Sequence, residues 1–156
     1  MMSRSCIIRG ADKADMPICA AILNDWIDET SWMPRVHDHE DVERYYSDIV
    51  FQERQVKIAD IDGRVCAFMA LSNDAYVTAL YANRAHRRAG LGKSLIDHAK
   101  TLFPDQLNLW TFDENKEAQR FYNREKFIEV RRTNGDNEEN LPDILFQWAP
   151  TEGATS

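Results

Sequence analysis

The chain has 156 residues, of which 44% are hydrophobic and 29% charged, and its formal net charge is −7 at pH 7. This length suits one domain with a full hydrophobic core, and the acidity argues against a broad electrostatic surface for DNA or RNA. The three cysteines show neither the spacing of a disulfide framework nor that of a structural zinc site. No signal peptide is recognisable, and no apolar run approaches the roughly 20 residues of a membrane-spanning helix. We therefore expect a cytoplasmic protein that binds neither nucleic acid nor membrane.

The first third of the chain predicts a strand, two helices and a loop between the helices. Residues 6–8 are apolar, and Asp12 is a suitable N-cap for a helix whose apolar residues recur at helical spacing from Met16 to Ile27. Residues 30–39 contain Pro34 among aromatic, basic and histidine residues, which is typical of a loop with some exposed apolar surface. A second helix is expected over about residues 40–50.

Three consecutive antiparallel strands are the simplest interpretation of the next segment. Residues 55–61 and 65–71 are rich in strand-forming residues, and Asp62-Gly63 between them is typical of a tight hairpin turn. A second turn at residues 72–74 leads into a strand over residues 75–82. A basic segment follows, and the helical spacing of apolar residues from Leu91 to Phe103 predicts a helix that Pro104 ends.

The last third predicts a strand over residues 107–111, a helix over 115–126 and a strand over 127–133. A hairpin with Asn134-Gly135 near its start returns through the acidic residues 136–143 to a last strand over 144–148. The small, polar residues from Pro150 onward are typical of a frayed end. We expect one domain over residues 1–149 and a flexible tail over residues 150–156.

The basic segment, residues 84–94, reads Arg-Ala-His-Arg-Arg-Ala-Gly-Leu-Gly-Lys-Ser and lies where a predicted strand turns into a helix. The first N–H groups of a helix have no internal partner and attract anions. Gly90 and Gly92 lack Cβ atoms, so a phosphate can approach the backbone closely. Arg87, Arg88 and Lys93 add positive charge. The segment therefore predicts a phosphate-binding site.

Two other interpretations of this segment are open at this point. Gly92-Lys93-Ser94 matches the end of a nucleotide-binding P-loop, but Arg87 stands where that motif requires its first glycine. The glycines could also simply start a helix beside solvated arginines, which is the usual explanation of an isolated Gly-x-Gly. The surrounding sequence decides which interpretation we prefer.

Residues 87–92 form the pattern R-x-x-G-x-G, entered from an apolar strand and leading into an amphipathic helix. This pattern resembles motif A of the GNAT superfamily of acyl-CoA-dependent N-acetyltransferases. Downstream, residues 115–122 form N-x-x-A-x-x-F-Y, followed by Phe127, which is similar to motif B of that superfamily. The order and separation of the two motifs are more specific than either motif alone. The resemblance spans most of the chain and is strongest over residues 79–127.

The resemblance implies an α/β fold of the α+β type, with a mixed, mostly antiparallel central sheet of about seven strands. About four helices would flank this sheet, which would be splayed between its fourth and fifth strands. Two positions depart from the family pattern. Arg84 replaces a frequent proline, which should alter only the stiffness of the loop. Lys126 replaces the glycine that commonly precedes the motif B phenylalanine, so we expect the helix end to differ locally.

The resemblance also implies that an acetyl group passes from acetyl-CoA directly to a primary amine, without a covalent enzyme intermediate and without a metal. In the family, the strand before motif A exposes backbone groups to the pantetheine arm, and Leu80 and Ala82 match these positions. The Leu80 N–H would then stabilise the charge that develops on the thioester oxygen. The residues expected to bind the coenzyme are Leu80, Ala82, Arg87, Arg88, Ala89, Gly90, Leu91, Gly92, Lys93, Ser94, Asn115 and Phe121.

Tyr122 matches the frequent general acid of the family, which protonates the departing coenzyme A thiolate. The alternative is that Tyr122 is a core aromatic residue, because it shares helical spacing with Ala118 and Phe121. Asn115 matches a residue that hydrogen-bonds the coenzyme, but it could equally cap its own helix. The two roles of Asn115 could coexist.

For the acceptor amine, the resemblance points to two loops. Trp32, Met33 and Arg35 lie in the loop between the first two helices, which helps to form the acceptor cleft in the superfamily. Glu139 and Asp143 lie in the loop before the last strand, where carboxylates could attract an ammonium group. The alternatives are a packed aromatic loop and a solvated acidic loop.

Several questions stay open at the level of the sequence. No residue stands out as the general base, and the acceptor could be a small molecule, a peptide or a protein. A non-catalytic acyl-CoA-binding sensor is the alternative to an enzyme. A homodimer is also expected to be feasible, because the exposed strand edges of this fold often support one.

Overall fold

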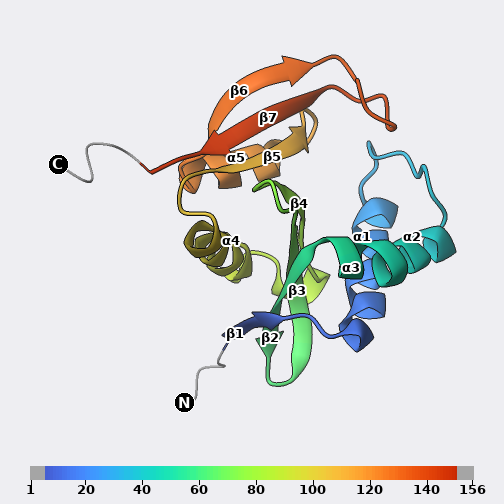
Figure 1. Cartoon of the computed structure of the whole chain (residues 1–156). Coiled ribbons are helices and arrows are strands. Elements are labelled where there is room, and N and C mark those ends of the chain that lie inside the picture. The colour runs from blue at the N-terminus through green and yellow to red at the C-terminus, as the bar shows by residue number, and fades with distance from the viewer. Residues whose placement is uncertain (1–5, 151–156) are drawn as a thin grey trace.

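The computed structural model describes residues 6–150 (Figure 1). The elements in chain order are β1 (Cys6–Gly10), a 3-10 turn (Lys13–Asp15), α1 (Met16–Glu29), α2 (His39–Tyr45), a π-helical turn (Tyr46–Val50), α3 (Phe51–Glu53), β2 (Gln55–Ile61), β3 (Arg64–Leu71), β4 (Val77–Ala82), a 3-10 turn (Arg84–His86), α4 (Leu91–Leu102), β5 (Leu107–Phe112), α5 (Lys116–Arg124), β6 (Ile128–Thr133) and β7 (Asp143–Trp148). The expected elements are therefore present, with ends shifted by a few residues. The second helix is the main difference, because a π-helical turn joins α2 to α3.

The seven strands form two antiparallel sheets, in the orders β1-β2-β3-β4 and β5-β7-β6. β4 and β5 meet only near one end, where Tyr76 and Asn108 form an isolated parallel bridge. Next to it, the Asn108 N–H donates to the Ala75 carbonyl at 2.8 Å. Beyond this bridge the strands of the second sheet turn away from β4 (Figure 1). The expected seven-stranded, mostly antiparallel sheet, splayed between its fourth and fifth strands, is confirmed.

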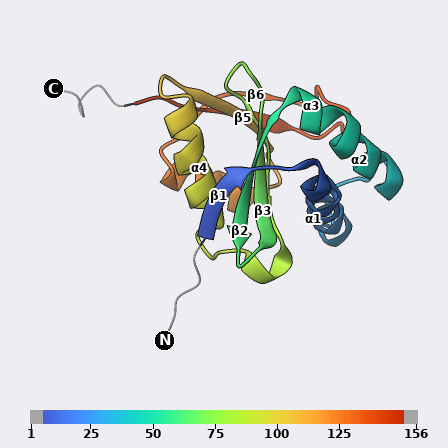
Figure 2. The ribbon, with the colours of Figure 1, turned by 60° about the horizontal axis from the view of Figure 1, so that its bottom comes forward.

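Helices cover both faces of the first sheet: α4 lies on one side, and α1 and α2 lie on the other (Figure 2). The core accordingly has two parts. Leu95 and Ile96 of α4 pack with Met69 on one face, whereas Met16 of α1 packs with Phe68 on the other. Neighbouring residues of β3 thus point into different parts of the core, as the alternation of a strand requires. No helix within residues 6–150 is long and apolar enough to cross a bilayer.

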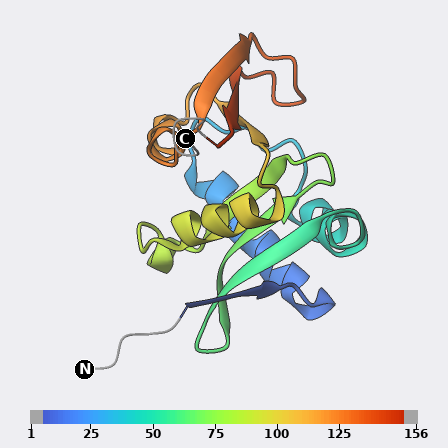
Figure 3. The ribbon, with the colours of Figure 1, turned by 60° about the vertical axis from the view of Figure 1, so that its left-hand side comes forward.

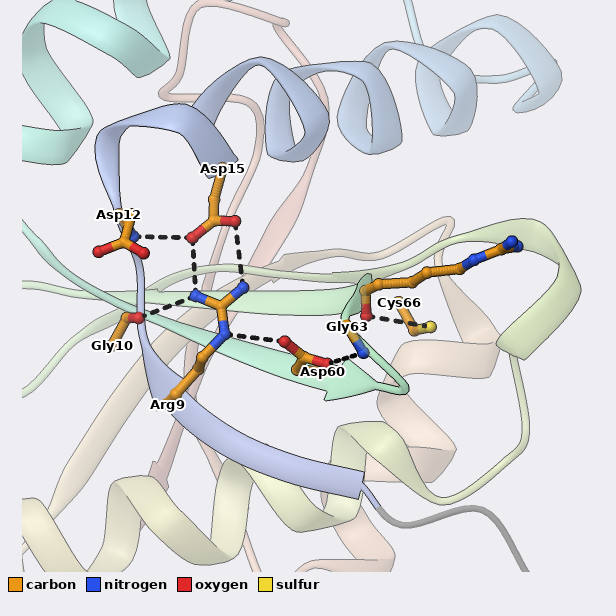
Figure 4. Close-up of polar contacts among 8 residues, drawn as sticks. Arg9, Gly10, Asp12, Asp15, Asp60, Gly63 and Cys66 are labelled. Atoms are coloured by element: carbon orange, nitrogen blue, oxygen red, sulfur yellow. Dashed lines mark hydrogen bonds and ion pairs between the residues drawn. The ribbon is translucent and has the colours of Figure 1, made fainter.

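An ion-pair network fixes the start of the chain to the first sheet (Figure 4). The Arg9 guanidinium donates to Asp15 at 2.8 Å and to Asp60 of β2 at 2.9 Å. Arg9 hydrogen bonds hold the pKa of the largely buried Asp15 carboxyl below its usual value. Asp60 also accepts a hydrogen bond at 2.8 Å from the N–H of Gly63. The hairpin turn is therefore tied to the same network.

The end of α5 corrects one expectation from the sequence. Lys126 itself adopts the left-handed conformation, with φ of 76°, although it is not glycine. The Phe127 N–H donates to the Tyr122 carbonyl at 3.0 Å and the Lys126 N–H to the Asn123 carbonyl at 3.2 Å. These two bonds are the pattern of a Schellman helix end. The expectation of a locally different helix end is therefore wrong, because the lysine takes up the conformation that glycine would adopt.

Candidate active site

The first cavity lies between β4, the start of α4 and α5, and its volume is about 750 Å³. Figure 3 shows α4 crossing the first sheet, with α5 beside the second sheet. The cavity wall includes these residues of the expected site: Leu80, Ala82, Arg87, Arg88, Gly90, Gly92, Lys93, Asn115, Phe121 and Tyr122. The structure thus brings both sequence motifs and the end of β4 to one cleft.

The loop before α4 has the backbone conformation of an anion-binding turn. Arg88 has φ of 65° and Gly90 has φ of 84°, so left-handed residues alternate with others in the loop. α4 begins at Leu91, and the first N–H groups of a helix lack partners within it. Two groups of residues expected to bind the coenzyme already donate hydrogen bonds within the protein. The Ala89 N–H donates to the His86 carbonyl at 3.3 Å, and the Ser94 hydroxyl donates to the Gly90 carbonyl at 3.1 Å.

Gly92 has a packing role that the sequence did not reveal. A Cβ atom at Gly92 would lie 3.2 Å from Cζ of Phe121. This distance is tighter than nearly all real Cβ contacts, so a side chain at Gly92 would force Phe121 to move. The glycine therefore allows the first turn of α4 to lie against α5. Gly90 differs, because nothing lies within 4 Å of its missing Cβ atom.

Each of the three basic residues that the glycine loop brings to the cleft is paired with a carboxylate. Arg87 forms a short ion pair with Glu29 at the end of α1 and donates to the Ala82 carbonyl at 3.3 Å. Arg88 lies 3.3 Å from Glu117, in a pair that is largely exposed. Lys93 lies 3.3 Å from Glu125 and 3.3 Å from Asp97, and its pKa is raised, most by the hydrogen bond to Glu125. A phosphate that binds here would compete with these carboxylates.

Among the strands within residues 6–150, none pairs with one edge of β4 near its end. Leu80 and Ala82 are paired with Met69 and Ala67 of β3. On the other side of β4, the bridge to the second sheet lies at Tyr76. This open edge of β4 lines the cleft, as the resemblance implies for the strand along which pantetheine lies.

Tyr122 belongs to the core and to the cleft. The residue is 9% exposed, and its ring makes edge contacts with Phe121 at 5.1 Å and Phe127 at 5.5 Å between ring centroids. Within residues 6–150, every fully buried side-chain oxygen or nitrogen has a hydrogen-bond partner. The Tyr122 hydroxyl has none there, so it is not fully buried. The hydroxyl therefore opens into the cleft. Burial raises the pKa of Tyr122, so the phenol keeps its proton at neutral pH.

Asn115 is the N-cap of α5, because its side-chain oxygen accepts the Ala118 N–H at 3.1 Å. The same residue lines the cleft. Its side-chain NH₂ group has no hydrogen-bond partner among residues 6–150 and is therefore available to a ligand. Capping, one of the two roles considered for this residue, is thus present.

A second cavity, of about 430 Å³, lies against the other sheet and the loop before β7. Its wall includes Glu139 and Asp143, together with Trp110 and Phe112 of β5. Asp143 is fixed by hydrogen bonds from the Thr133 hydroxyl and, at 3.1 Å, from the Asn137 amide. The two acidic residues expected near the acceptor are therefore placed at one cavity.

The loop between α1 and α2 lies beside this cavity without lining it. The Trp32 ring contacts the Phe112 ring at 5.9 Å between centroids, in an edge arrangement. Arg35 is bound to Asn24 at 3.0 Å and to Asp28 at 2.8 Å, so it fixes the loop to α1. Met33 lines neither cavity; its N–H donates to the Thr30 carbonyl at 3.1 Å. Of the three expected acceptor residues in this loop, Trp32 comes nearest to a cavity wall.

Two residues that the sequence analysis missed connect these regions. Tyr81, between Leu80 and Ala82, lines the first cavity and packs against Trp26 at 5.3 Å between ring centroids. Trp26 in turn contacts Trp32 at 5.7 Å. The alternation of β4 could have indicated that Tyr81 faces a different way from its neighbours. Trp26, the aromatic residue of α1, gave no comparable signal.

The fold and the cleft define a class of protein, and comparison with known families agrees with it. Residues 20–127 match the acetyltransferase (GNAT) family, and the chain belongs to this family. It is therefore an acyltransferase, and acetyl-CoA is its co-substrate.

Known proteins resemble this chain over nearly all of their own length. It is 25% identical over 150 residues to the peptidyl-lysine N-acetyltransferase YiaC of Escherichia coli (strain K12), covering 91% of this chain and 96% of that protein. Apo-form YjaB from Escherichia coli has a TM-score of 0.77 and 21% identity, covering 94% of this chain and 99% of that one. The structure of yncA from Salmonella typhimurium with its cofactor acetyl-CoA has a TM-score of 0.70 and 21% identity, covering 95% of each chain.

Proposed function

We propose that this protein transfers the acetyl group of acetyl-CoA directly to a primary amine of a small molecule, a peptide or a protein. The observation that carries the proposal is the single cleft that joins the glycine loop, the open edge of β4 and the Tyr122 hydroxyl. Holding both substrates together accounts for a large part of the acceleration that such a site can give.

The residues of the cleft divide the work between binding and chemistry. The backbone N–H groups at the start of α4 bind the pyrophosphate, and the Asn115 amide contacts the coenzyme. The Leu80 N–H donates to the thioester oxygen as negative charge develops there. Tyr122 protonates the sulfur as the C–S bond breaks, since burial keeps the phenol protonated.

Two measurements test this function. Calorimetry should show binding of acetyl-CoA and no binding of Mg-ATP, because Arg87 occupies the position of the first P-loop glycine. A panel of polyamines, aminoglycosides, amino acids and peptides should then yield at least one acetylated product. Lysine peptides belong in the panel because the relative YiaC is a peptidyl-lysine N-acetyltransferase. Binding of acetyl-CoA without any product would instead support a non-catalytic acyl-CoA sensor.

A further inference from the structure

Glu139 is a half-buried carboxylate at the wall of the second cavity, whereas Asp136, which lines the same cavity and also has no side-chain partner among residues 6–150, is exposed. Within residues 6–150 the side chain of Glu139 makes no ion pair and no hydrogen bond to another residue. Its neighbour Glu138 is paired with His37 at 3.2 Å, and Asp143 is held by Thr133 and Asn137. Glu139 is therefore free to interact with a molecule in the cavity.

The surroundings of Glu139 favour its protonated form more than water does. Burial is the main cause of its raised pKa, and the charges of Glu138 and Asp143 add to it, whereas a hydrogen bond from the backbone N–H of Glu139 itself and, less strongly, His37 oppose it. The other charged groups at the cavity are Asp136 and Arg131. Arg131 lies over the Trp110 ring at 5.0 Å, and neither group is among the causes of the shift. A carboxylate with a raised pKa is a better proton acceptor near neutral pH.

Glu139 is also electrostatically connected to the donor cleft. Burial and, next, the charge of Glu139 raise the pKa of Tyr81 to about 12. Tyr81 in turn adds to the rise in the pKa of Tyr122 that burial causes. Tyr81 and Tyr122 both line the first cavity. Ring contacts also link the two cavities, because Tyr81 of the first packs against Trp26, Trp26 against Trp32, and Trp32 against Phe112 of the second.

We propose that Glu139 is the catalytic base, which takes a proton from a cationic acceptor amine entering through the second cavity. This inference rests on the proposed acetyl transfer. The carboxylate of Glu139 removes one proton from the primary ammonium. The freed nitrogen lone pair forms the N–C bond at the thioester carbonyl, and the C–S bond then breaks. The sulfur takes the phenol proton of Tyr122, and the Tyr122 oxygen recovers a proton from the acetylated nitrogen. Glu139 finally releases its proton to water.

The test compares Glu139→Gln with the adjacent control Glu138→Gln, using the best acceptor of the amine panel. We expect Glu139→Gln to lower kcat by about 10²-fold or more, since general base catalysis typically contributes 10²–10⁴-fold. In the wild type the rate should fall as the pH drops through the pKa of Glu139, and this acidic limb should vanish in Glu139→Gln. Affinity for acetyl-CoA should stay unchanged. Glu138→Gln should keep the wild-type kcat above the acidic limb, with the limb moved slightly to lower pH because one charge that raises the pKa of Glu139 is removed.

A second variant separates a chemical role from a structural one. In Glu139→Ala, added formate should restore part of kcat, because a small carboxylate can enter the space of the missing side chain. Wild-type turnover in Glu139→Gln would overturn the role of Glu139 as the base but not the proposed acetyl transfer. So would a variant whose KM rises while kcat and the acidic limb stay unchanged, since Glu139 would then only attract the amine. A wild-type protein that acetylates no amine would overturn the proposed function as well.

Discussion

At the scale of single residues, Tyr122 has a buried ring and a hydroxyl group that opens into the cleft. Two roles were open for Tyr122 at the level of the sequence: a core aromatic residue, which its helical spacing with Ala118 and Phe121 indicates, and the general acid of the family. The structure shows that the first does not exclude the second, because the ring and the hydroxyl have different surroundings. The assignment as the acid stays a proposal that mutation can test.

Replacing Tyr122 by phenylalanine removes the proton donor and preserves the ring. We expect Tyr122→Phe to lower the rate of acetyl transfer by about 10²–10⁴-fold. Acetyl-CoA affinity should stay close to that of the wild type, because the ring contacts with Phe121 and Phe127 remain. Steady-state kinetics and calorimetry measure the two quantities. Tyr45→Phe, at an exposed position on α2, is the control, and a wild-type rate in Tyr122→Phe would refute the acid role.

Gly90 allows a sharp test of the phosphate loop because Gly63 provides a matched control. Both glycines have positive φ, of 84° and 82°, and both have open space where a Cβ atom would be. Tryptophan should therefore strain the backbone similarly at the two positions. We expect Gly90→Trp to weaken acetyl-CoA binding at least about tenfold, or about 1.4 kcal/mol, by filling the space of the pyrophosphate. Gly63→Trp should bind normally; equal binding by both variants would contradict the loop assignment.

At the scale of elements, the end of α5 shows how the backbone can compensate for an unfavourable residue. Lys126 takes a left-handed conformation that costs an L-residue about 1–2 kcal/mol. The two hydrogen bonds of the helix end and the burial of Phe127 help to hold it there. Sequence reasoning expected a different helix end because it considered the local preference of lysine alone.

Glycine at this position should stabilise the protein. We expect Lys126→Gly to raise the free energy of unfolding by about 0.5–1 kcal/mol, because the relief of left-handed strain exceeds the extra entropy of glycine in the unfolded chain. Urea denaturation measures this change. Arg120→Gly, in the right-handed interior of α5, should instead lower the free energy of unfolding by about 0.5–1 kcal/mol. Destabilisation by both substitutions would show that Lys126 is not strained.

At the scale of the whole molecule, the two sheets meet through one strand bridge and a shared core on the side of α4 and α5. The proposed coenzyme site is built from both halves, since β4 belongs to the first sheet and α5 packs on the second. A ligand in the cleft therefore connects parts of the protein that have few direct contacts near the splay. Its effect on stability should be global.

Acetyl-CoA should accordingly protect the protein from heat. At a concentration of 100 times Kd, a ligand that binds only the folded state adds about 2.7 kcal/mol to the free energy of unfolding. For a chain of this length, this corresponds to a rise in Tm of about 5–10 °C. Differential scanning calorimetry measures it, with Mg-ATP as the negative control. A Gly90→Trp protein that showed the same rise would argue that acetyl-CoA binds outside the proposed cleft.

The sequence by itself determined the order of the elements, the glycine loop at a strand-to-helix turn and the two motifs of an acetyltransferase. These features depend on local spacing: the period of apolar residues, the turn dipeptide Asp62-Gly63 and the short patterns at residues 87–92 and 115–122. The homodimer and the acceptor stay predictions. The exposed Ile128 and Val130 of the edge strand β6 do not identify what would cover that strand.

Only the tertiary structure decided how these parts meet. The pairing of Arg87 with Glu29, the packing of Phe121 against Gly92 and the contact of Trp32 with Phe112 all join segments far apart in the chain. Such contacts depend on how the sheets and helices pack, which no local pattern records. The sequence therefore predicted the coenzyme loop, whereas only the packing of the second sheet placed Glu139 at the wall of a cavity beside β5.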